Sequence, residues 1–201
     1  MKTCEYDGAP FTEPRSHPWT DSASCADYRY VDLKADPSQI RTSLEDFVPW
    51  GHHAAIDDFY ALVEWVNGPR STLESNDCAF TGPHANESPS FAKALQCSGR
   101  IMVLFSALAR NLSRPGIESF KDSLHHRLGE IDAAFSWGII GTTILPVRYV
   151  TLPGPAKQQL GYQLMISFWA WGSREEELMT NLGRVLRNLS QALQRVVASA
   201  N

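Results

Sequence analysis

The feature that most constrains the fold is the last quarter of the chain, residues 160–201. It begins with a regular alternation of side chains, the pattern of a β-strand with two different faces. One face carries Leu160, Tyr162, Leu164, Ile166, Phe168 and Ala170. The other face carries Gly161, Gln163, Met165, Ser167, Trp169 and Trp171. We therefore expect a strand that buries one face against a core.

A long helix is expected directly after this strand. Gly172 interrupts the alternation, and Ser173 followed by Glu176 has the spacing of a capping box at a helix start. From Leu178 to Val197, leucines and valines recur at helical spacing. The helix should therefore span about 25 residues and present a single apolar stripe.

The remaining segments are shorter. The patterns predict a strand at 28–33, helices at 36–47, 53–67 and from 115, a strand at 72–80, a loop at 81–89, a helical turn within 90–96, and one or two strands at 139–152. The most apolar stretch, 100–108, is interpreted as a buried strand, although its periodicity fits a buried helix equally well. We expect an α+β fold: a mixed or antiparallel sheet of about four to six strands packed against amphipathic helices.

The length of 201 residues and the 43% hydrophobic content predict one domain with an ordinary core. Residues 1–24 are rich in proline and polar residues, so we expect an irregular arm there and a single α+β domain over 25–201. No apolar run is long enough to cross a membrane, and the first residues lack a secretory signal. These features favour a cytoplasmic protein. The sequence does not indicate an oligomeric state.

Charge is distributed unevenly between the two halves. Residues 1–90 carry 6 Lys+Arg and 15 Asp+Glu, net −9, whereas residues 91–201 carry 12 and 7, net +5, for a total of −4. The asymmetry indicates either internal complementarity or an acidic surface that meets a partner. The acidic balance argues against nucleic-acid binding.

A cluster of histidines and acids is the main candidate for chemistry. On one helix His53, Asp57 and Glu64 share nearly one azimuth, which raises the possibility of a metal-dependent enzyme or small hydrolase. The second histidine of a zincin motif is missing, and acids favour a helix N-terminus. We therefore interpret the group as a solvated face and expect no metal, cofactor or catalytic residue. His125-His126 should also face solvent, and Cys97 is only a remote candidate for a nucleophile.

Tryptophans and one mixed polar stretch are better candidates for recognition. Trp is enriched at interface hot spots, and residues 73–80 combine hydrogen-bonding side chains with an apolar end. Core packing and a polar edge strand are the alternative interpretations of these residues. The expected partner-binding residues are Trp65, Glu74, Asn76, Asp77, Trp169 and Trp171.

Two segments resemble a known family. Glu-Trp-Val-Asn-Gly-Pro at 64–69, followed by Leu-Glu-Ser-Asn-Asp-Cys-Ala-Phe at 73–80, is similar to bacterial immunity proteins of polymorphic-toxin and type VI secretion systems. The nearest group accompanies restriction-endonuclease-like nuclease toxins. The resemblance implies a non-enzymatic cytoplasmic protein that binds and blocks a cognate toxin. Clustered carboxylates would suit the basic surface of such a nuclease.

Overall fold

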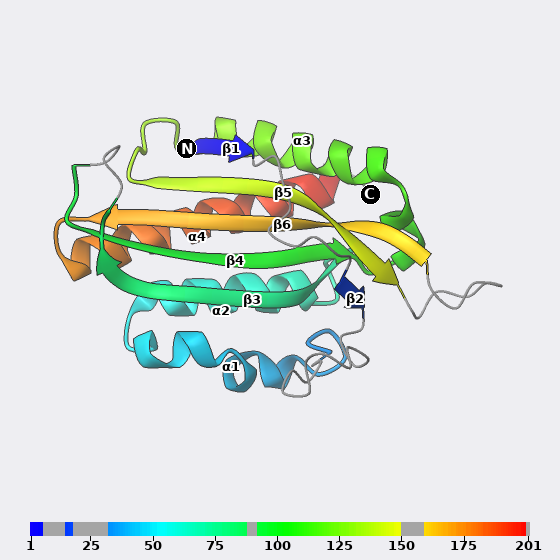
Figure 1. The fold of residues 1–201 in the computed structure, drawn as a ribbon, viewed down its shortest axis with the longest axis horizontal. Coiled ribbons are helices and arrows are strands. Elements are labelled where there is room, and N and C mark those ends of the chain that lie inside the picture. The colour runs from blue at the N-terminus through cyan, green and yellow to red at the C-terminus, as the bar shows by residue number, and fades with distance from the viewer. Residues whose placement is uncertain (6–14, 18–31, 88–91, 150–158, 200–201) are drawn as a thin grey trace.

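The computed structural model describes residues 1–5, 15–17, 32–87, 92–149 and 159–199. At its centre is a mixed six-stranded sheet with the order β1-β5-β6-β4-β3, in which β2 also pairs with β5 (Figure 1). Its strands are β1 (Lys2–Glu5), β2 (Arg15–His17), β3 (Leu73–Ala85), β4 (Leu95–Phe105), β5 (Gly138–Tyr149) and β6 (Gln159–Gly172). The antiparallel run β5-β6-β4-β3 forms most of the sheet, and β1 and β2 add to β5 in parallel.

Helices cover one face of this sheet. The α-helices are α1 (Ile40–Ser43), α2 (Ala54–Asn67), α3 (Arg114–Glu130) and α4 (Glu175–Ser199), and the 3₁₀ helices are η2 (Pro37–Gln39), η3 (Glu45–Trp50) and η4 (Leu108–Leu112). Helices α2 and α4 lie side by side behind the sheet in Figure 1, and α3 runs along the β1–β5 side. The expected α+β architecture with a long C-terminal helix is confirmed. Within the described residues, no helix combines the length and apolar character needed to cross a bilayer.

The apolar stripes predicted for α4 and β6 form the main core. Leu186 and Leu189 are buried on α4, and Ile166 and Phe168 are fully buried on the facing side of β6. Leu160 differs, because it is 59% exposed at the end of β6 that extends beyond α4 (Figure 1). We call this helix-covered side of the sheet the inner face, and the opposite side the outer face.

The start of α4 differs in detail from the predicted capping box. The helix begins at Glu175, and the Ser173 N–H donates to the carboxylate of Glu177 at 2.8 Å rather than to that of Glu176. Lys93 contacts the same carboxylate at 2.6 Å. Since the helix begins two residues after Ser173, the glutamate four residues on is the one that reaches back.

The N-terminal stretch also differs from expectation. Residues 1–24 were expected to be irregular, yet their described parts are the strands β1 and β2. Pairing with the edge of β5 uses backbone groups, so it requires no alternating side-chain pattern. Most of the strand expected at 28–33 lies outside the described residues, and Leu33 is in a turn.

Three further boundaries were wrong. The helix expected at 36–47 is broken into η2, α1 and η3. Strand β3 continues to Ala85, into the expected loop, because the register shift between Thr81 and His84 accommodates Gly82 and Pro83. Residues 90 and 91 of the expected helical turn lie outside the described residues, and its described part, 92–96, is irregular up to the start of β4 at Leu95. Strand β4 also shows that the apolar 100–108 stretch is mainly strand.

Candidate partner-binding surface

A bulge in β3 determines which side chains reach the outer face. The register with β4 shifts between Ser75 and Asp77, so that Ser75 pairs with Val103 and Asp77 pairs with Met102. Because Val103 belongs to the inner core, Ser75 faces the helices while Asp77 lies on the outer face. The extra residue, Asn76, occupies the bulge.

Asn67, the last residue of α2, fixes this bulge from the inner face. Its Oδ1 accepts from the Ser75 N–H at 3.0 Å, and its Nδ2 donates to Ser75 Oγ at 2.8 Å and to the Val63 carbonyl at 2.9 Å. Both Asn67 and Ser75 are buried. The two segments that carry the family resemblance, 64–69 and 73–80, are thus one structural unit.

Side chains also bind backbone groups of β3 along its edge that faces away from β4. Lys34 Nζ donates to the Leu73 carbonyl at 2.9 Å, and Asp46 accepts from the Phe80 N–H at 3.4 Å. Together with the Asn67–Ser75 contact, they occupy edge groups that another strand would need. The candidate contact surface is therefore not this edge but the partly exposed region of the outer face around Ser98, Arg100 and Trp169.

Polar side chains on the outer face link three strands. Asn76 Nδ2 donates to Gln163 Oε1 at 2.8 Å, although the two residues are 87 positions apart. Gln163 is fully buried, and its Nε2 donates to the sulfur of Met102 at 3.1 Å. The bulge is therefore anchored to β6 across β4.

An ion pair stands beside this link. The Arg100 guanidinium contacts Asp77 Oδ2 through Nε at 3.2 Å and through an Nη atom at 3.1 Å. The side chains of Arg100 and Asp77 are 36% and 21% exposed, so both charges remain accessible to a partner. A half-exposed pair of this kind contributes to specificity more than to stability.

The ion pair borders a hollow of about 250 Å³ on the outer face. It is lined by Ala79, Phe80, Thr81, Ser98, Gly99, Arg100, Met165, Ser167 and Trp169. Trp169 is half-buried and supplies an apolar wall together with Met165, while Ser98, Ser167 and Thr81 supply hydroxyls. A concave site with an aromatic wall and polar margin suits one or two side chains of a partner protein.

The structure thus brings together only some of the expected binding residues. Asn76, Asp77 and Trp169 gather on the outer face near the hollow. Glu74 lies farther along that face, opposite Leu104. Trp171 is on the outer face too but only 4% exposed.

Trp65 is the clear exception. It belongs to α2 and packs against the inner core, away from the outer face. Sequence reasoning also missed Ser98, Arg100, Gln163 and Ser167. The signal for the first two was the alternation of Ser98 and Arg100 with apolar residues at the start of β4.

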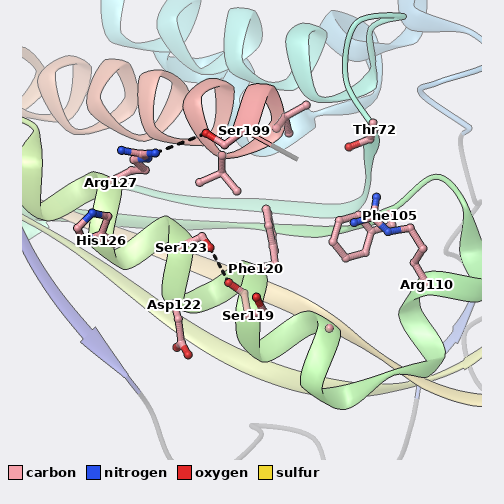
Figure 2. Close-up of a pocket in the computed structure, with 13 residues that line it drawn as sticks. Thr72, Phe105, Arg110, Ser119, Phe120, Asp122, Ser123, His126, Arg127 and Ser199 are labelled. Atoms are coloured by element: carbon pink, nitrogen blue, oxygen red, sulfur yellow. Dashed lines mark hydrogen bonds between the residues drawn. The ribbon is translucent and has the colours of Figure 1, made fainter. Parts of the chain in front are cut away.

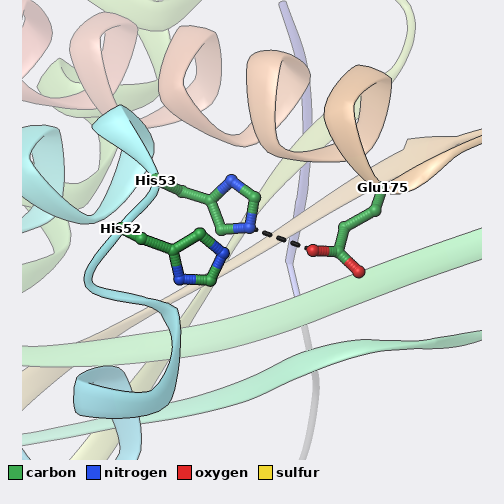
Figure 3. Close-up of side chains that lie close together, drawn as sticks. All are labelled: His52, His53 and Glu175. Atoms are coloured by element: carbon green, nitrogen blue, oxygen red, sulfur yellow. Dashed lines mark hydrogen bonds and ion pairs between the residues drawn. The ribbon is translucent and has the colours of Figure 1, made fainter.

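The histidine–acid group considered as a possible metal site, His53, Asp57 and Glu64, is not assembled. The Arg41 guanidinium instead binds Asp57 Oδ1 at 3.0 Å and Glu64 Oε1 at 3.2 Å. His53 instead contacts Glu175, at the start of α4, at 3.0 Å (Figure 3). One helix azimuth was therefore not enough to gather the three side chains.

The two adjacent histidines on α3, His125 and His126, lie in different environments. His126 is 71% exposed, as expected, but the side chain of His125 is only 17% exposed and its Nε2 lies 2.8 Å from Thr142 Oγ1. Burial lowers the pKa of His125, with the nearby Glu5 carboxylate opposing that effect.

Cys97 is buried and Cys78 is partly buried. Burial raises the pKa of the Cys97 thiol to about 12 and raises that of Cys78 as well. Little thiolate forms at neutral pH, so neither is suited to be a nucleophile.

A second hollow, of about 430 Å³, lies between α3 and the end of α4 (Figure 2). Phe105 and Phe120 contribute its apolar lining, and the Arg110 guanidinium lies 3.8 Å from the centre of the Phe105 ring. Its described lining includes none of the six expected binding residues.

Comparison of the chain with protein-family models, curated proteins and solved structures gave no match.

Proposed function

We propose that this chain is a non-enzymatic protein that binds and neutralises a toxin effector, and that the contact surface is the outer face around Trp169. The contact surface is inferred from the hollow that Trp169, Arg100 and three hydroxyls line, with Asp77 paired to Arg100 at its border. Aromatic and arginine side chains in such hollows contribute disproportionately to binding energy.

The class of partner rests on the family resemblance. The two resembling segments contain Asn67 and Ser75, which are hydrogen-bonded to each other. They also contain the β3 bulge at which Asn76 and Asp77 lie on the outer face. A toxin of a polymorphic or type VI secretion system, with a nuclease as the expected type, is the corresponding proposal. Neutralisation of such a toxin would take place in the cytoplasm.

The acidic excess of residues 1–90 supports the proposal less than the hollow does. Several of these acids contact cations of the second half, as in Glu5–Lys121, Asp58–Arg187 and Asp77–Arg100. Internal complementarity therefore accounts for part of the asymmetry. Recognition should depend on the Trp169 hollow more than on long-range attraction between charges.

The test is a titration against the toxin-like protein encoded beside this gene, with growth rescue of a bacterial host as the functional readout. We expect Trp169→Ala and Arg100→Gln to weaken binding by about tenfold or more, which corresponds to about 1.4 kcal/mol. Leu160→Ala is the matched control, because Leu160 is exposed on the same strand about 30 Å away at 3.3 Å per residue.

The two parts of the proposal fail separately. If wild-type protein neither binds the toxin nor rescues growth, the proposed function is wrong. If the wild type binds and both hollow variants bind equally well, the function stands and the contact surface lies elsewhere.

A further inference from the structure

We propose that His52, His53 and Glu175 form a binding site for a zinc ion, independent of the proposed toxin contact. One potential ligand atom from each residue lies within 4.8 Å of the other two (Figure 3). Within the part of the chain that the structure describes, no other histidine, cysteine and acid group of three or more meets this criterion.

The geometry is close to that of a bound site. Tetrahedral zinc with ligands at about 2.0–2.2 Å requires ligand atoms about 3.4 Å apart. His53 Nε2 and Glu175 Oε1 are already 3.0 Å apart, and the two imidazole rings lie beside each other with centroids 4.0 Å apart. Small side-chain rotations would let an ion replace the direct hydrogen bond.

The packing of two helices holds these ligands in place. His53 precedes the first residue of α2, and Glu175 is the first residue of α4. Gly183 allows the helices to approach closely, because a Cβ there would lie 2.8 Å from Asp58 Oδ2. Arg187 pairs with Asp58 across the same contact. His52 and His53 lie in the turn that leads directly into α2, so the contact between the starts of α2 and α4 brings the two halves of the site together.

Chemistry and charge favour zinc at this position. Two neutral imidazoles and one carboxylate are borderline-soft ligands that suit zinc and leave a fourth position open. The N-termini of α2 and α4 carry partial positive charge, each about half a unit, which opposes a cation. The full carboxylate charges of Glu175 and Glu176 in the first turn of α4 outweigh it, whereas Asp57 and Glu177 are already paired with Arg41 and Lys93.

Calorimetric titration of the intact chain with zinc chloride at neutral pH tests the site. We expect one saturable site in the wild type and at least about tenfold weaker binding in His52→Ala, His53→Ala and Glu175→Gln. His126→Ala is the matched control, since His126 also stands beside a glutamate, Glu130, but no third ligand completes a group there among the described residues.

Circular dichroism of each variant verifies that it is folded, and the three ligand residues are at least partly exposed, so folding should be retained. A wild type without saturable binding would overturn the inference. Binding that persists in all three ligand variants, or that is lost in His126→Ala, would overturn it too. None of these results bears on toxin binding, because the site lies at the starts of α2 and α4 rather than on the outer face.

Discussion

Asn67 and Ser75 bind each other twice: Ser75 donates its backbone N–H to Asn67 Oδ1 at 3.0 Å, and Asn67 donates to Ser75 Oγ at 2.8 Å. Both residues are buried, so solvent does not replace these bonds when they are lost. The pair joins the end of α2 to β3 immediately before the bulge. It therefore controls both stability and the position of Asp77 on the outer face.

Replacing Asn67 should accordingly destabilise the protein. Asn67→Ala leaves the buried Ser75 N–H without its partner and removes one bond of the Ser75 hydroxyl, and we expect a loss of about 1–3 kcal/mol in the free energy of unfolding. Ser75→Ala removes only one of the two bonds and should cost less. Urea denaturation of both single variants and the double variant measures the coupling, and purely additive losses would contradict the contact.

The core of α4 gives a second prediction. Leu189 is fully buried, so Leu189→Ala should lower the free energy of unfolding by about 2–5 kcal/mol. Leu160→Ala is the control, because that leucine is 59% exposed and its truncation should change stability by less than about 0.5 kcal/mol. Equal melting temperatures for the two variants would show that α4 is not packed on the sheet as described.

His125 predicts a pH dependence of stability. Its pKa is lowered by burial first, while Glu5 and Asp122 act to raise it and Lys121 acts to lower it further. The unfolded chain therefore binds the proton more readily than the folded one, so the stability contribution is complete above about pH 6.5 and is lost as the pH falls below it. The Nε2 contact with Thr142 favours the neutral ring in the same direction when Nε2 accepts.

The measurement is a series of melting temperatures between neutral and mildly acidic pH. We expect His125→Gln to reduce the acid sensitivity relative to the wild type, because glutamine does not titrate. His126→Gln is the matched control, since His126 is mostly exposed. An identical pH profile for His125→Gln and the wild type would refute the assignment.

The buried thiols give a fourth prediction. Cys97 is fully buried with its pKa raised to about 12, and burial raises the pKa of Cys78 as well. In a variant with Cys4→Ser and Cys25→Ser, the two remaining thiols should react with a thiol reagent only after unfolding. Labelling of the native variant as fast as that of free cysteine would reopen the case for a reactive cysteine.

Local periodicity determined the elements that bury one face along their whole length. Leu186 and Leu189 of α4, and Ile166 and Phe168 of β6, are buried as their spacing predicts. Such a pattern needs only the neighbours within one segment, because a helix or strand repeats its own geometry. The fold class followed from these segments for the same reason.

Tertiary structure alone decided which residues share a surface. Asn76 binds Gln163 only because β3, β4 and β6 pair in register. Trp65 lies apart from the other expected binding residues because α2 packs on the opposite face of the sheet. The approach of His53 to Glu175 similarly depends on how α2 crosses α4. These contacts join positions that are far apart in the chain, so no local pattern encodes them, whereas the pairing and packing of whole elements do.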